Sequence, residues 1–186
     1  MALLPFRHAL QAAILAALLL PACHTAGPYG HSKVYSPTGP ERGAVATAAE
    51  YDPHAFDRSP EKWRDRPVWL FGVVTNRGTV PDGGAYVAVS IRSLQLRNLC
   101  EMDDEDTCRV TVSEREHGTL KLLLNLAPED DRGELSVGPG SLLRVVGKIG
   151  QDADPIEGTP IMRVSFYRHW PRGYFVTTKA ASVMHR

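Results

Sequence analysis

The feature that most constrains the fold of this 186-residue chain is a series of short apolar stretches, most of which alternate with polar residues. Alternation at every second position is typical of a β-strand with one buried face. Turn-forming Gly, Pro, Asn and Asp residues separate the stretches. The sequence therefore predicts a mainly β domain of five to seven strands. The stretches run over 68–74, 85–97, 119–126, 141–150, 161–170 and 174–178.

Local patterns add detail to these strands. Gly72, inside the apolar run VWLFGVV, suits a buried strand or one that bends at a barrel corner. The apolar parity changes at Arg92-Ser93, which predicts a β-bulge. A short helix over Pro60–Arg64 is expected, capped by Ser59. In 161–170, alternation places Met162, Val164, Phe166 and Trp170 on one face and Arg163, Ser165, Tyr167 and His169 on the other.

The run GSLLRVVGKIG resembles the fourth strand of OB-fold domains, in which a glycine turn leads into a strand that ends in a Gly-Lys step. The whole stretch Arg66–Trp170 is similar in pattern to the OB-like barrels of some bacterial outer-membrane lipoproteins, including the starvation-inducible family. This resemblance implies a small five- to seven-stranded OB-like barrel with a short helix, but it transfers no functional residue. A β-sandwich is the structural alternative.

The N-terminal region has the features of an export signal. Arg7 precedes an apolar run from Ala9 to Leu20, shorter than the 20 or so residues that span a bilayer, so residues 1–22 are predicted to be a signal peptide. Leu20-Pro21-Ala22-Cys23 resembles a bacterial lipobox, which implies cleavage before Cys23 and its modification by acyl chains such as palmitate. An ordinary secretory peptide cut near Ala22 is the alternative.

The rest of the chain divides by composition. Residues 23–50 are rich in Gly, Pro, Ser, Thr and Ala without hydrophobic periodicity, so they are expected to be a flexible, lipid-anchored tether. Residues 51–186 are expected to form the OB-like β domain. His24 stands where an Asp would signal inner-membrane retention, so the expected location is the outer membrane, facing the periplasm. Secretion or surface exposure is the alternative.

Two cysteines remain after Cys23. In an oxidising compartment Cys100 and Cys108 are expected to form a disulfide, because two cysteines without further Cys or His ligands nearby do not make a zinc site.

The loop that Cys100 and Cys108 close is strongly acidic. It is a candidate docking surface for a basic partner, or a calcium site that lacks the EF-hand order of ligands, and its candidate residues are Asp103, Asp104 and Asp106. We expect no metal and no cofactor.

Aromatic and basic residues gather near the C-terminus, and the candidate binding residues there are Tyr167, Arg168, His169 and Tyr174. Such groups can contact a glycan or a peptide, or can simply cover the strand. The formal net charge of zero argues against a nucleic-acid partner. Catalytic motifs such as a P-loop, HExxH or GxSxG do not occur.

The sequence therefore favours a non-enzymatic, lipid-anchored envelope module that binds or scaffolds an envelope protein or glycan. The alternatives are a periplasmic enzyme with a site assembled in space, and a carrier of small molecules or lipids that uses the barrel interior.

Overall fold

The computed structural model describes residues 29, 31–80 and 84–184. The predicted signal peptide over 1–22 and the predicted acylation site Cys23 lie outside the described residues. Among the helices that are described, none is both long and apolar enough to cross a bilayer.

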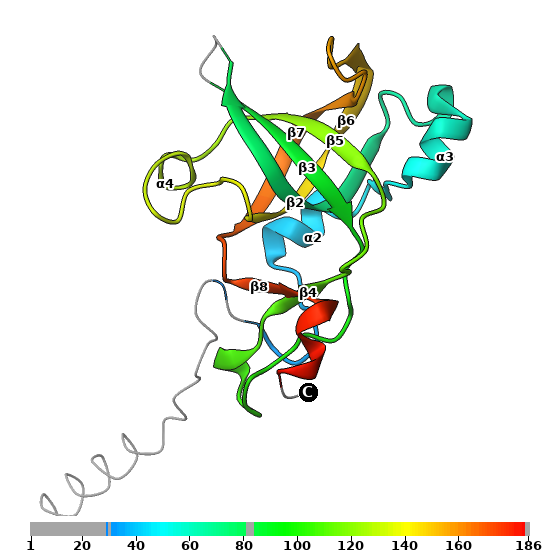
Figure 1. Cartoon of the computed structure of the whole chain (residues 1–186). Coiled ribbons are helices and arrows are strands. Elements are labelled where there is room, and N and C mark those ends of the chain that lie inside the picture. The colour runs from blue at the N-terminus through cyan, green and yellow to red at the C-terminus, as the bar shows by residue number, and fades with distance from the viewer. Residues whose placement is uncertain (1–28, 30, 81–83, 185–186) are drawn as a thin grey trace, which may run out of the picture.

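The centre of the molecule is a closed five-stranded barrel (Figure 1). The strands follow one another around it in the order β2, β3, β5, β7 and β6, and a further pairing of β2 with β6 closes the ring. The β5–β7 pair is parallel and the other four pairs are antiparallel. This is an OB-like fold, as predicted, and the closure rules out the β-sandwich. The barrel strands are β2 (Pro67–Thr79), β3 (Ala85–Arg92), β5 (Thr119–Leu124), β6 (Leu142–Ala153) and β7 (Pro160–Trp170).

Smaller elements surround the barrel. β1 (Ala49–Glu50) extends the sheet beside β2, and β4 (Val110–Val112) pairs with β8 (Phe175–Thr177) below it. The short helices are α2 (Gly39–Val45), α3 (Pro53–Arg58) and α4 (Pro128–Asp131), with 3₁₀ turns at Pro60–Lys62, Glu105–Thr107 and Thr178–Ser182. The helix expected over 60–64 is therefore a 3₁₀ turn, and it follows a helix that the sequence analysis missed.

The barrel interior is filled as the strand patterns predicted. Leu120, Leu122 and Leu124 of β5 all point into the core, which alternate positions on one strand must do. The predicted inward residues of β6 lie in the same cluster: Leu143, Val145 and Ile149. Gly72 also faces inward, and a Cβ there would stand 2.8 Å from the Cβ of Val89, so a larger residue has no room.

Strand β7 departs from the predicted alternation. Its pairing with β6 shifts register between Val146 and Gly147, which face Phe166 and Val164, so Ser165 is an extra residue. The bulge changes which side chains point inward beyond it. Met162 and Val164 contact the barrel core as predicted, whereas Phe166 and Trp170 face outward. Tyr167 and His169 point inward instead.

The bulge predicted at Arg92-Ser93 is wrong, because β3 simply ends at Arg92. The chain then leaves the barrel. Leu94 pairs with Val112 of β4 and packs in a second apolar cluster, while Leu96 is exposed. The change of parity therefore marked a strand end.

The segment from His31 to Glu50, expected to belong to a flexible tether, is packed on the outside of the barrel. It covers the second apolar cluster, with Tyr35 lying against it and α2 beneath the barrel in Figure 1. The composition was misleading because a few specific contacts hold the segment: those of the buried Glu41, and backbone hydrogen bonds from His31 to Cys108 and from Tyr35 to Leu96. The core of this second cluster consists of Phe71, Val110, Val112, Leu142 and Trp170.

Glu41 is fully buried and accepts hydrogen bonds from Tyr35, Arg144 and Arg168. Its distance to Arg168 is 2.9 Å. Burial by itself would raise the pKa of this carboxyl, but the hydrogen bonds from Tyr35, Arg144, the Thr38 backbone and Arg168 together hold the pKa below its usual value. Arg168 also lies 3.0 Å from Nε2 of His31. The N-terminal segment is therefore attached to the barrel by a buried ion-pair network.

Candidate functional site

A row of side chains crosses the outer face of β3, β5 and β7. The strand registers place Tyr86 opposite Leu123, and Leu123 opposite Arg163. The next row holds Lys121, which lies beside Ile161. Neighbouring Cβ atoms in such rows are about 5 Å apart, so these side chains act together. We call these five residues, Tyr86, Lys121, Leu123, Ile161 and Arg163, the outer face.

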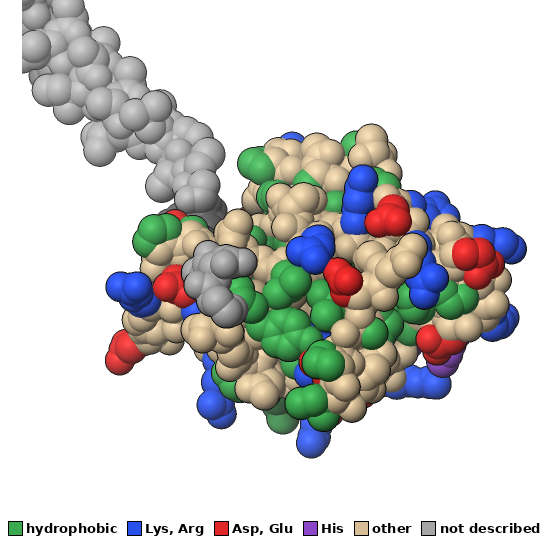
Figure 2. Space-filling model, turned by 90° about the horizontal axis from the view of Figure 1, so that it is seen from above, with side chains coloured by type: hydrophobic (Ala, Val, Ile, Leu, Met, Phe, Trp, Pro, Cys, Tyr) green, Lys and Arg blue, Asp and Glu red, His purple; other side chains and the backbone are tan. Residues whose placement is uncertain are grey.

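A groove begins where this sheet opens. The parallel ladder of β5 and β7 ends at Leu123 and Arg163, so the next residues of the two strands face each other across a gap. One hollow of about 430 Å³ lies against Leu123, Asn125 and Arg163. A second, of about 310 Å³, shares Asn125 with it and reaches Phe166. Each hollow has the size of a small-ligand pocket. Figure 2, seen from above, shows apolar side chains gathered in the middle of this end, with charged ones around them.

The polar groups of the outer face are paired with acids of the β6–β7 hairpin. Lys121 Nζ lies 2.9 Å from Glu157 Oε2 and 5.9 Å from the centroid of the Tyr86 ring. Arg163 lies 2.9 Å from Asp152. The Tyr86 hydroxyl donates to Asp154 at 2.7 Å. Burial, together with that hydrogen bond, raises the pKa of Tyr86 to about 12, so the hydroxyl stays protonated and remains a donor.

The four candidate residues near the C-terminus do not form one site. Tyr167 donates to Asp130 at 2.8 Å and His169 lies 2.7 Å from the same carboxylate. Arg168 points the other way, into the network around Glu41. Tyr174 packs against Tyr29, with ring centroids 4.6 Å apart. The alternation of β7 places Tyr167 and His169 on one face and Arg168 on the other, and Tyr174 lies beyond the end of the strand.

His169 belongs to a chain of hydrogen bonds with the order of a catalytic triad. Its Nε2 lies 3.1 Å from the Ser141 hydroxyl and its Nδ1 is bonded to Asp130. Ser141, however, is only 2% exposed. The amides beside it are occupied: Gly138 donates to the Ser141 hydroxyl, Gly140 to Val74, and Ser141 to Gly138. No N–H of 138–141 is thus left for an oxyanion, and the arrangement instead holds the α4 segment to the barrel.

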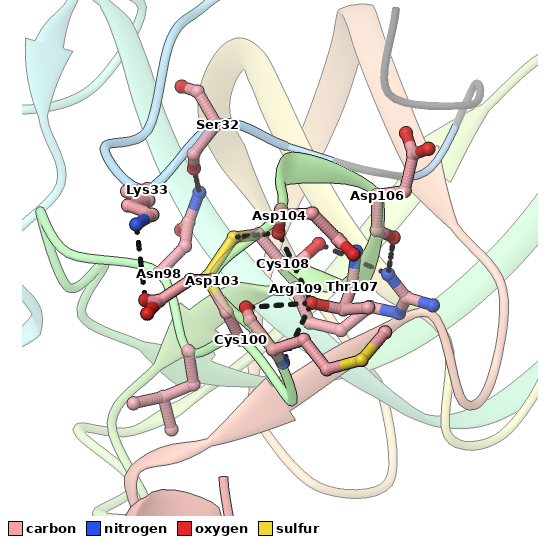
Figure 3. The surroundings of a disulfide bond; sticks show 12 residues. Ser32, Lys33, Asn98, Cys100, Asp103, Asp104, Asp106, Thr107, Cys108 and Arg109 are labelled. Carbon is pink, nitrogen blue, oxygen red and sulfur yellow. Dashed lines mark hydrogen bonds and ion pairs between the residues drawn. A yellow bond between two sulfur atoms is a disulfide. The ribbon is translucent and has the colours of Figure 1, made fainter. Parts of the chain in front are cut away.

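The predicted disulfide is confirmed between Cys100 and Cys108 (Figure 3). By the chain-entropy model, a loop of this size stabilises the fold by about 2.5 kcal/mol. Asp103 and Asp104, two of the acidic residues in this loop, contact different groups. Asp103 pairs with Lys33 at 3.2 Å, and Asp104 accepts from the amide of Thr107 at 3.0 Å.

The Asp106 carbonyl accepts from Arg109 at 2.8 Å. The side chains of Asp103 and Asp104 thus make separate local contacts. Throughout the described part of the chain, no group of three or more His, Cys, Asp or Glu side chains is placed to hold a metal ion.

Sequence reasoning missed the outer face. Tyr86 and Lys121 stand at the polar positions of two alternating strands, which is the local signal that was available. That they lie together depends on strand register and on the parallel pairing of β5 with β7, neither of which is encoded in one stretch of sequence.

Comparison with known proteins gives little beyond the fold. No family model and no curated protein sequence matches this chain. A solved structure that matches is the protein priB from Ralstonia solanacearum, with 16% identity and a TM-score of 0.30 over 56% of this chain and 97% of that one.

Two expectations are corrected at this point. An OB-like barrel is a fold whose second and third strands bind oligonucleotides, so the expected absence of a nucleic-acid partner is withdrawn. The expectation of a lipid-anchored envelope scaffold gains no support from the fold or from the comparison, and it is withdrawn as well. The enzyme and carrier alternatives gain no support either. The zero net charge does not exclude such a partner, because it averages over the whole chain, whereas a binding face depends on where its few cations lie.

Proposed function

We propose that this protein is a non-catalytic OB-fold module that binds single-stranded nucleic acid on the outer face. The observation that carries the proposal is the row in which Tyr86, Leu123 and Arg163 stand side by side at the mouth of the groove. In OB-folds the second and third strands, here β3 and β5, and the loops beside them are where oligonucleotides and oligosaccharides bind.

The chemistry of the face matches the parts of a nucleotide. The ring of Tyr86 and the outward-facing Phe166 offer flat apolar surfaces on which a base can stack. Lys121 and Arg163 supply the cations for two phosphates. The Arg163 side chain is 69% exposed, whereas the Lys121 side chain is 11% exposed and would have to exchange Glu157 for a phosphate. The Asn125 amide, shared by both hollows, can donate to and accept from a base edge.

Binding of a fluorescein-labelled single strand of about ten nucleotides tests this proposal by anisotropy at low salt. If two phosphates are neutralised, the logarithm of the binding constant falls with the logarithm of salt with a slope of about −1.4. We expect Lys121→Ala to weaken binding and to change the slope to about −0.7. Tyr86→Ala should weaken binding by about 1–3 kcal/mol with the slope unchanged.

Lys179→Ala is the matched control, because Lys179 is exposed and lies in the 3₁₀ turn Thr178–Ser182, beside β8 and away from the outer face. It should leave both the affinity and the slope unchanged. If Lys179→Ala and Lys121→Ala weaken binding equally, the interaction is a general attraction to positive charge and the proposed face is wrong.

We also propose that the chain is exported to the cell envelope, at the outer membrane. The disulfide between Cys100 and Cys108 supports an oxidising compartment, and the signal features of residues 1–22 support export. The intact mass of the protein recovered from fractionated cells is the test. We expect a mature product that begins at Cys23, and recovery of the uncleaved chain from the cytoplasm would overturn the proposal.

A further inference from the structure

The hairpin that joins β6 to β7 places a carboxylate on each polar group of the proposed binding face. Asp152 pairs with Arg163, Asp154 accepts from Tyr86, and Glu157 pairs with Lys121. These three acids, which we call the hairpin acids, occupy the groups that phosphates would have to reach. We infer that the hairpin acids compete with the phosphates of the ligand and set the affinity of the site; this inference rests on the proposed function.

The geometry of the turn keeps one of these acids, Asp154, in place. Asp154 Oδ1 accepts from the amides of Ile156 and Glu157, at 3.0 and 2.8 Å, while its Oδ2 accepts from Tyr86. The amide of Gly158 donates to the Asp154 carbonyl at 2.8 Å, and Gly158 itself has a φ of +68°, which favours glycine. One residue, Asp154, therefore both shapes the turn and connects it to the face.

A phosphate can displace two of the hairpin acids, Asp152 and Glu157, from their partners. The carboxylates of Asp152 and Glu157 are 60% and 58% exposed. Exposed ion pairs contribute little to stability, so exchanging a carboxylate for a phosphate costs little structure. The competition should nevertheless lower the affinity, because a strand must either release the acids or approach them against like charge. Salt screens both the attraction of the phosphates to the cations and their repulsion by the hairpin acids, so the loss of affinity that the acids cause should be largest at low salt.

The test is the double variant Asp152→Asn/Glu157→Gln, which removes two charges and leaves Asp154, the residue that shapes the turn, unchanged. Its matched control is Asp103→Asn/Glu105→Gln, which removes the same charge from exposed acids of the disulfide loop, away from the outer face. We expect the hairpin variant to bind the labelled single strand about tenfold more tightly than the wild type, and the control variant to change affinity less than twofold.

An uncharged-backbone oligonucleotide of the same sequence separates charge competition from other effects. It should bind the wild type and the hairpin variant equally, since it has no phosphate for the acids to oppose. Thermal unfolding of each variant, expected within about 2 °C of the wild type, shows that the fold is retained.

Equal binding of the charged strand to the wild type and the hairpin variant would overturn the inference and leave the proposed function standing. Failure of both proteins to bind any strand at low salt would instead overturn the proposed function.

Discussion

Replacing Glu41 with Ala is expected to lower the free energy of unfolding by about 3–5 kcal/mol, the cost of removing one partner from a buried ion pair. The carboxylate is fully buried and is bonded to both Arg144 and Arg168. Arg144 is only 6% exposed in the wild type, so without Glu41 its buried charge is uncompensated. Chemical denaturation monitored by tryptophan fluorescence measures the change. Glu134→Ala, at an exposed position, is the control and should stay within about 0.5 kcal/mol of the wild type.

The effect of Glu41→Ala should also depend on pH. The folded pKa of Glu41 lies below its ordinary value of 4.5, so the stabilisation is complete above about pH 4.5 and is lost as the pH falls through the folded pKa. The difference between the wild type and the variant should therefore narrow in acid. A difference that stays constant down to pH 3 would mean that the loss comes from packing, and it would contradict the ion-pair account.

His31 gives the wild type a second loss of stability in acid. Burial first, and then the neighbouring Arg168, lower the pKa of His31 to about 4, so the folded protein keeps the ring neutral. Its Nε2 can then accept from Arg168. Because a histidine in the unfolded chain titrates near 6.5, the folded state loses stability as the pH falls from about 6.5 toward 4.

Gly147→Ala is expected to destabilise the protein by about 3 kcal/mol or more, at the upper end of the cost of overpacking. A Cβ at this position would stand well inside 3.0 Å of the Arg163 carbonyl oxygen and 2.9 Å from Cγ of Met162. The carbonyl belongs to the backbone of β7 beside its bulge, so it cannot move without disturbing the β6–β7 register. Thermal and denaturant unfolding measure the loss.

Gly150→Ala is the control in the same strand. A Cβ there meets nothing closer than 3.9 Å, and the backbone needs no positive φ. Its effect should lie within about 1 kcal/mol of the wild type and can be stabilising, because alanine restricts the unfolded chain. Equal losses at Gly147 and Gly150 would show that β6 disfavours any side chain, rather than that Gly147 meets the backbone of β7.

The parts of the fold that could be predicted are the strands in which apolar and polar residues alternate over a short range. The inward leucines of β5 and the inward residues of β6 were found because burial on one face repeats every second position. The disulfide followed from counting cysteines. The alternation failed at Ser165, because one extra residue in β7 reverses every later side chain and nothing local marks it.

The candidate site depended on long-range pairing and so escaped prediction. Tyr86, Lys121 and Arg163 come from three strands, and the parallel β5–β7 pairing that joins two of them links residues some forty positions apart. The error in the segment 31–50 has a different cause. Its composition suggested disorder, but a buried carboxylate with several partners, backbone hydrogen bonds to residues 96–108 and the packing of Tyr35 compensate for the lack of apolar periodicity.

The two ends of the described chain meet at one pole of the barrel. Tyr29 packs on Tyr174, and β8 with the last 3₁₀ turn lies beside β4 on the side away from the β2–β3 and β6–β7 connections (Figure 1). A molecule attached to a surface through either terminus would therefore present its groove to the solvent, where a diffusing ligand can reach it. Immobilising the protein through its N-terminus should leave the groove as open to an incoming strand as it is in free solution.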